Sequence, residues 1–129
     1  MNFYISKIVT NQNFEEAIMN VTEALATDGF GILTEINVKD TFKKKLDVDF
    51  KKYIILGACN PHFAHKALTL EDKLGVFLPC NIVIEEHDNG EVEVSAVDPV
   101  VSLSPVKNES VENIALEIQQ KLKRIIESL

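Results

Sequence analysis

Hydrophobic and polar residues follow two periods along the chain, which predict strands and helices in succession. Alternation or short apolar runs predict strands at residues 3–9, 30–38, 53–59, 80–86 and 91–97. Helical spacing between capping signals predicts helices at 14–28, 40–46, from 61 onward and at 110–129. The order βαβαβαββα predicts an α+β fold: a single-domain α/β sandwich over residues 1–129 with a mixed five-stranded sheet and about four helices.

Local signals refine these elements. Asn13 with Glu16 is typical of a capping box, and Asp40 is expected to cap the second helix. Asn89-Gly90 predicts a type I′ turn that joins 80–86 and 91–97 into a C-terminal antiparallel hairpin. The strand 53–59 is apolar on both faces, so we expect it inside the sheet with both faces covered. Gly31 indicates a bulge or a close backbone approach.

The C-terminal helix carries the clearest apolar stripe in the chain. We expect Ser110 to cap it and its stripe to pack onto the sheet, with a subunit interface as the alternative. The stripe consists of Val111, Ile114, Ala115, Ile118, Leu122, Ile125, Ile126 and Leu129. The preceding segment, 98–109, holds more apolar residues than a solvated linker needs, so it is expected to lie over the core or over a partner.

Composition narrows the classes of partner. The net charge of −7 and the pI near 4.9 oppose binding to nucleic acid or to an anionic membrane. No apolar run reaches the roughly 18 residues of a membrane span, and no secretion signal is visible, so a soluble cytoplasmic protein is expected. Although the chain as a whole is acidic, residues 43–52 contain five lysines. Such a group usually forms a solvated surface and less often a patch that binds anions.

The main candidate site is the junction at Cys59-Asn60-Pro61, where a strand ends and a helix begins. Asn60 is expected to be the N-cap and Pro61 the first helical residue. Free backbone N–H groups and the helix dipole favour anions there and can lower a thiol's pKa.

Both cysteines allow several interpretations. Cys59 and Cys80 are predicted as small core-filling side chains, with a cytosolic redox pair as an alternative. Together with His62 and His65 they also form a possible Cys₂His₂ metal set. The spacing argues against a metal, since neither C-x₂₋₄-C nor H-x₃₋₅-H occurs and both histidines point away from the core contact of their helix.

No catalytic constellation is recognised, so an enzyme is not indicated. His62 lies one turn beyond Cys59, but its imidazolium is disfavoured near a helix N-terminus. Glu85 and Glu86 point to opposite faces of a strand, and His87 is most simply a surface residue beside the turn. Glycine patterns for nucleotide binding are absent from the sequence, and it identifies no cofactor.

Two motifs carry a resemblance: Gly57-Ala-Cys-Asn-Pro61 and Leu78-Pro-Cys-Asn81, with Asp28-Gly-Phe-Gly31 upstream and Ala96-Val-Asp-Pro99 downstream. With them, nearly the whole chain resembles the bacterial and archaeal family called domain of unknown function 302. The resemblance implies a small α+β domain that forms a homodimer and has no agreed activity. Family motif positions are occupied by Cys59, Asn60, Pro61, Pro79, Cys80 and Asn81. His62 and His65 are not among them.

Three functions remain open. The first is a small-molecule-binding or regulatory module whose pocket is walled by Gly57–Pro61 and Leu78–Asn81 and closed by the apolar loop 99–106. The second is a thiol-redox or metal-handling protein that uses Cys59 and Cys80. The third is a purely structural dimerising domain.

Overall fold

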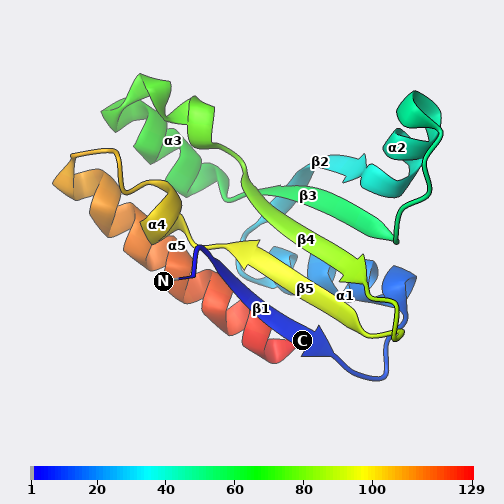
Figure 1. Cartoon of the computed structure of the whole chain (residues 1–129). Coiled ribbons are helices and arrows are strands. Elements are labelled where there is room, and N and C mark those ends of the chain that lie inside the picture. Colours follow the sequence, from blue (N-terminus) through cyan, green and yellow to red (C-terminus); the bar gives the residue numbers. More distant parts are fainter. Residues whose placement is uncertain (1) are drawn as a thin grey trace.

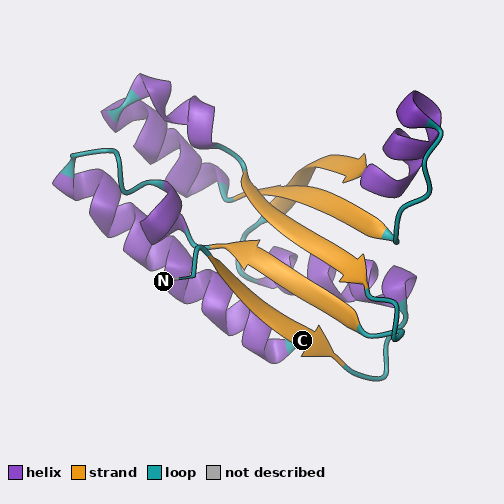
Figure 2. Cartoon of the chain, viewed as in Figure 1, coloured by secondary structure: helices purple, strands orange, loops and turns teal. Residues whose placement is uncertain are grey.

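A five-stranded sheet with helices on one face forms the structure, a computed structural model that describes residues 2–129 (Figures 1 and 2). Its strands are β1 (Tyr4–Val9), β2 (Gly31–Asn37), β3 (Tyr53–Cys59), β4 (Cys80–Glu86) and β5 (Val92–Val97). Its helices are α1 (Phe14–Thr27), α2 (Val38–Leu46), α3 (Pro61–Leu70), the 3₁₀ helix η1 (Asp72–Phe77), α4 (Pro99–Ser102) and α5 (Glu109–Ser128). This confirms the predicted α+β class, the five strands and the four longer helices. None of the described helices has the length and apolar character needed to span a bilayer.

The sheet has the order β1-β5-β4-β3-β2, and all of its pairings are antiparallel. The prediction of a mixed sheet is therefore wrong in this detail. A helix between two strands usually crosses over to a parallel neighbour. Here α2 and the α3–η1 segment lie beyond the ends of the strands, so β3 and β4 each return beside the preceding strand in the opposite direction (Figure 1). Only α1 makes a long connection, between β1 and β2 at the two edges of the sheet.

The predicted C-terminal hairpin is confirmed, although its turn is of another type. Strands β4 and β5 pair directly, and the His87 N–H donates to the Glu91 carbonyl at 2.8 Å. A type I′ turn requires positive φ at both central residues. In this turn Gly90 has φ +86° whereas Asn89 does not have a positive φ. Asn89 instead accepts the Glu91 N–H through its side chain.

One face of the sheet holds the core. The inward side chains of β3, β4 and β5 are fully buried beneath α1 and α5: Ile54, Leu56, Ala58, Ile82, Ile84, Val92, Val94 and Ala96. The Asn13–Glu16 capping box starts α1 as predicted. The predicted stripe of α5 is also confirmed as core, since Val111, Ile114, Ala115, Ile118, Leu122, Ile125 and Ile126 are all buried. That burial removes these residues as a subunit interface.

The opposite face of the sheet is not covered by a helix layer, and it faces the viewer in Figures 1 and 2. Tyr53 and Ile55 of β3 point to this side and are half-buried, whereas Ile54 and Leu56 are buried against the helices. The prediction that β3 is covered on both faces was therefore wrong. The apolar residues on the second face of β3 belong to a surface that is half-exposed to solvent.

Two helix starts differ from the prediction by two or three residues. Asn37, not Asp40, caps α2, and its side chain accepts the Asp40 N–H. Asn108, not Ser110, caps α5 and accepts the N–H groups of Ser110 and Val111. In each case two residues of a type that caps helices lie within three positions of each other. The sequence pattern alone therefore does not decide which of them is the N-cap.

Close backbone approach occurs at Gly57 and not at Gly31. A methyl group added to Gly57 would overlap the Thr34 hydroxyl and come within 2.7 Å of Pro79 Cγ. A methyl group on Gly31 would meet nothing within 4 Å, and the predicted bulge follows it, between Ile32 and Thr34. Gly57 thus permits the segment before β4 to lie directly against β3.

We expect Gly57→Ala to destabilise the protein by about 1–3 kcal/mol, because the new methyl group overpacks against two neighbours. The matched control is Gly31→Ala, a strand position with open space, which should change the free energy of unfolding by less than about 1 kcal/mol. Urea unfolding followed by circular dichroism measures both. Equal effects of the two substitutions would contradict the steric role of Gly57.

Candidate functional site

A cavity of about 360 Å³ lies at the end of the core where β3 ends and β4 begins. Its walls come from strands β2 to β5 and from helices α3, η1, α4 and α5. The lining residues are Phe30, Leu33, Ala58, Cys59, Asn60, Phe63, Ala64, Ala67, Leu68, Leu74, Gly75, Phe77, Leu78, Pro79, Cys80, Asn81, Val97, Pro99, Ser102, Leu103, Val111, Ile114 and Ile118. The volume falls within the range of small-molecule sites, roughly 300–1,000 Å³.

Both predicted segments contribute to this cavity. Residues 58–60 and 78–81 lie on its wall, whereas Gly57 and Pro61 do not. The loop expected to close the site also takes part, since Pro99 and Leu103 are buried on the wall beside α5. The sequence did not indicate the large share of the wall that comes from α3, η1 and the first half of α5.

Asn60 has a structural role at the edge of the cavity. Its side-chain oxygen accepts the Phe63 N–H at 3.5 Å, as expected of an N-cap, and its amide nitrogen donates to the Asp28 carbonyl at 3.4 Å. Gly29 has a positive φ of +82° and passes against this amide. Asn60 therefore joins the end of α1 to the start of α3.

Few polar residues line the cavity. Apart from the thiols they are Asn60, Asn81 and Ser102. Within residues 2–129, neither the Asn81 amide nor the Ser102 hydroxyl makes a side-chain hydrogen bond. The Ser102 hydroxyl is thus free to bind a polar group of a ligand at this mainly apolar wall. Asn81 is exposed, and alternation places its side chain on the uncovered face of the sheet with Val83 and Glu85.

Both cysteines are free thiols, and burial opposes their ionisation. Desolvation raises the pKa of Cys59, and it raises the pKa of Cys80 to about 11, with a further contribution from the charge of Cys59. The expected lowering of the Cys59 pKa by the α3 dipole is therefore not observed. Strand register places Cys80 opposite Ala58, so alternation directs the two thiols toward different faces of the sheet.

His62 and His65 are exposed on α3, as predicted from their positions on the helix. They do not converge with Cys59 and Cys80 into a group that could hold a metal ion. The Cys₂His₂ set considered from the sequence is therefore not assembled. Pro61 is also exposed and serves as the first residue of α3.

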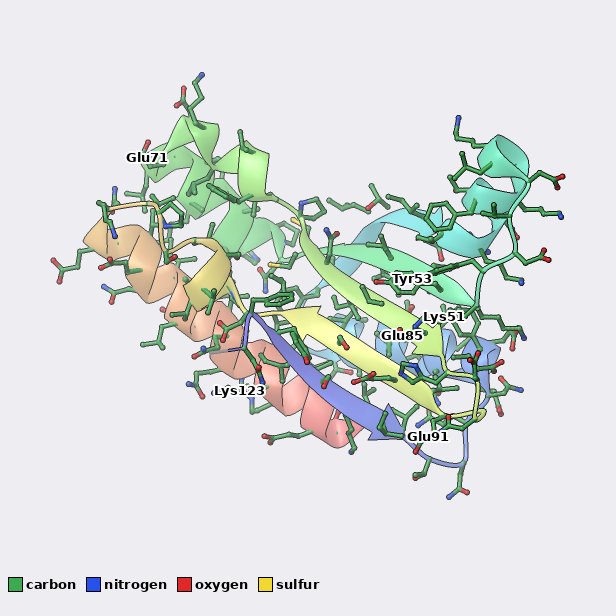
Figure 3. The ribbon with its side chains drawn as sticks, viewed as in Figure 1. Lys51, Tyr53, Glu71, Glu85, Glu91 and Lys123 are labelled. Atoms are coloured by element: carbon green, nitrogen blue, oxygen red, sulfur yellow. The ribbon has the colours of Figure 1, made fainter. Side chains whose placement is uncertain are left out.

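A different cluster, which sequence reasoning missed, lies at the other end of β4. Glu85, His87 and Glu93 offer ligand atoms that all lie within 4.8 Å of one another. Glu85 also accepts the Lys51 ammonium at 2.6 Å, and Figure 3 shows these two side chains beside Tyr53 on the uncovered face. The Glu85 contact raises the pKa of Lys51. The missed signal was the spacing of Glu85 and His87 around a predicted hairpin, which alternation alone places on one face.

Comparison with known proteins places the chain in a family. The model of the family described as "Domain of unknown function DUF302" matches residues 5–129. A solved structure described as that of an uncharacterized conserved DUF302 protein from Bacillus stearothermophilus is similar, with a TM-score of 0.90 at 26% sequence identity over 98% of each chain. No curated protein matches the chain. The match covers nearly the whole sequence, and the chain belongs to the DUF302 family.

Proposed function

We propose that the protein is a binding module whose cavity takes a small, predominantly apolar molecule. The observation that carries this proposal is the 360 Å³ cavity, which brings residues 58–60 and 78–81 together on a mostly apolar wall. Burial of apolar surface supplies about 25 cal/mol per Å², so such a wall favours an aliphatic or aromatic ligand. Ser102 is the group that can fix the orientation of its polar end.

Binding without chemical conversion fits this wall better than catalysis does. Among the residues that line the cavity there is no carboxylate, histidine or lysine. General acid–base catalysis requires a titratable group within hydrogen-bond reach of the reacting atom. The remaining candidates for a nucleophile are the two thiols, and both are held in their protonated form.

Filling the cavity should abolish binding. Ala64 lies half-buried on the wall, and we expect Ala64→Phe to weaken the binding of decanoic acid, a small apolar probe, by tenfold or more because the new ring occupies its space. Isothermal titration calorimetry measures the affinity, and native mass spectrometry of the purified protein tests for a ligand retained from the cell.

The matched control is Ala24→Phe, at a half-buried alanine of α1 that does not line this cavity. It should leave the affinity for decanoic acid unchanged. Absence of both a retained ligand and probe binding would refute the proposal, as would equal effects of the two substitutions.

The thiol-redox alternative needs at least one ionised cysteine at neutral pH. The pKa of Cys80, about 11 instead of 9.0, lowers its thiolate fraction roughly 100-fold, since each pKa unit is a factor of ten. The register also directs Cys59 and Cys80 to different faces, which opposes a disulfide. These features support core-filling and wall-forming roles for both residues.

Alkylation kinetics test this assignment. In the variant Cys59→Ser, desolvation still raises the pKa of Cys80, although the contribution of Cys59 is gone. We therefore expect Cys80 to react with iodoacetamide at least about tenfold more slowly than a model thiol at pH 8. Because the thiolate fraction rises tenfold per pH unit below the pKa, the rate should increase about tenfold per unit between pH 8 and 10. The same variant in guanidinium chloride is the control and should react like the model thiol. A rate that levels off below pH 9 would restore the redox alternative.

We also propose a homodimer through the uncovered face of the sheet, because that face carries a group of neighbouring apolar side chains. Tyr53, Ile55, Val83 and Val97 are half-buried there, and the rings of Phe3 and Tyr4 pack edge to face at its border. A C₂ dimer places the same patch of both copies in contact and so covers these apolar side chains, whereas Glu85 and Glu93 lie at one end of the face. The α5 stripe cannot serve this purpose, since it is inside the core.

Val83→Lys should weaken association at least tenfold, because in a C₂ dimer it places a long charged side chain from each copy near the middle of the contact. Sedimentation velocity at micromolar concentration measures the change in mass. Val76→Lys is the control, since Val76 of η1 is 81% exposed and lies away from the face; it should leave the mass unchanged. A monomeric wild-type protein, or a dimeric Val83→Lys variant, would contradict this interface.

A further inference from the structure

We propose that Glu85, His87 and Glu93 form a binding site for one divalent transition-metal ion, with Zn²⁺ as the best-fitting probe. The three ligand atoms lie within 4.8 Å of one another, and His87 Nε2 is 2.8 Å from Glu93 Oε1. Zinc binds nitrogen and oxygen ligands at about 2.0–2.2 Å, so two ligands of a tetrahedral ion are about 3.5 Å apart. Small side-chain rotations are therefore enough to close the set around an ion.

Strand register creates this concentration of negative charge. Glu85 of β4 and Glu93 of β5 are directly opposite each other in the ladder, on the uncovered face of the sheet. Like charges at opposite positions destabilise a strand pair unless a cation offsets them. Both side chains are also largely shielded from solvent, with 16% and 23% of their surfaces exposed, which strengthens the repulsion.

The hairpin holds the three ligands on a rigid frame. His87 follows the last residue of β4, and its backbone N–H donates to the Glu91 carbonyl while its carbonyl accepts the Gly90 N–H, each at 2.8 Å. Glu85 and Glu93 are both within paired strands. A site whose ligands come from one hairpin needs little ordering when the ion arrives.

Lys51 acts as the cation of this cluster when no metal is bound. Its ammonium lies 2.6 Å from Glu85 Oε1 and 6.0 Å from the centre of the Tyr53 ring. An arriving metal ion competes with this ammonium for the Glu85 carboxylate. The two carboxylates carry two negative charges, and Lys51 offsets one of them. The second remains when His87 binds a metal ion, because a ligating imidazole is neutral.

The mixture of ligands selects the class of metal. One imidazole with two carboxylates suits zinc and related first-row ions, whereas Mg²⁺ prefers oxygen ligands and keeps its water. Three protein ligands leave a fourth position for water or another molecule. The site is separate from the apolar cavity, since none of its three ligands lies on that wall.

Calorimetric titration of the whole protein with Zn²⁺ tests the site. We expect one ion per chain, no comparable binding of Mg²⁺, and affinity reduced about 100-fold or more in His87→Ala and Glu93→Gln. Lys51→Met should raise the affinity on the order of tenfold, since it removes the competing cation. Circular dichroism confirms that each variant is folded.

The control variant is His62→Ala with His65→Ala, which removes both exposed histidines of α3 and should not change the affinity. Substitution of Co²⁺ for zinc should give a spectrum without the intense near-ultraviolet absorption of a thiolate ligand. No stoichiometric Zn²⁺ binding would overturn the proposal, and so would binding that survives in His87→Ala, disappears in the α3 variant or shows thiolate absorption. Unchanged affinity in Lys51→Met would overturn the competing role of Lys51.

Discussion

Burial of only one face of the sheet is the constraint on which the rest of the structure depends. Helices α1 and α5 cover that face, and the inward residues of β3, β4 and β5 are fully buried beneath them. The remaining helices are left to lie beyond the strand ends (Figure 1). Because α3, η1 and α4 extend past the sheet, the core continues between them without strands to fill it. The cavity is the end of the core, and this explains why its wall is so apolar.

The sequence predicted what depends on neighbours along the chain. The Asn13–Glu16 capping box, the Asn60-Pro61 helix start and the buried stripe of α5 all follow from spacings within one or two helical turns. The antiparallel order of the sheet depends on which distant strands pair, and alternation along one strand carries no information on its partner. We expected both faces of β3 to be covered, whereas helices cover only one. The sequence does not distinguish these cases, because apolar residues occupy a half-exposed face as well as a buried one.

The two cysteines show why a correct local structure gave a wrong expectation about chemistry. Cys59 does precede the N-cap of α3, yet a helix dipole contributes only about 0.3–1 kcal/mol, less than one pKa unit. Asn60 also occupies the Phe63 N–H that an anion would bind. Desolvation raises the pKa of Cys59, in the direction opposite to the dipole, and so burial dominates there. Burial depends on tertiary packing, which the dipeptide Asn60-Pro61 does not reveal.

Strand β4 links the two proposed sites without mixing their chemistry. Cys80 at its start lines the apolar cavity, whereas Glu85 points to the other face of the strand and belongs to the charged cluster, about 16 Å further along at the rise of an extended strand. His87 was interpreted from sequence as a surface residue because the carboxylates that make it a candidate ligand come from two strands. Only the register of β4 against β5 places Glu85 opposite Glu93. Two like charges held together on a rigid hairpin are costly to keep, so their juxtaposition requires a cation, which Lys51 supplies in part and a metal ion would supply in full.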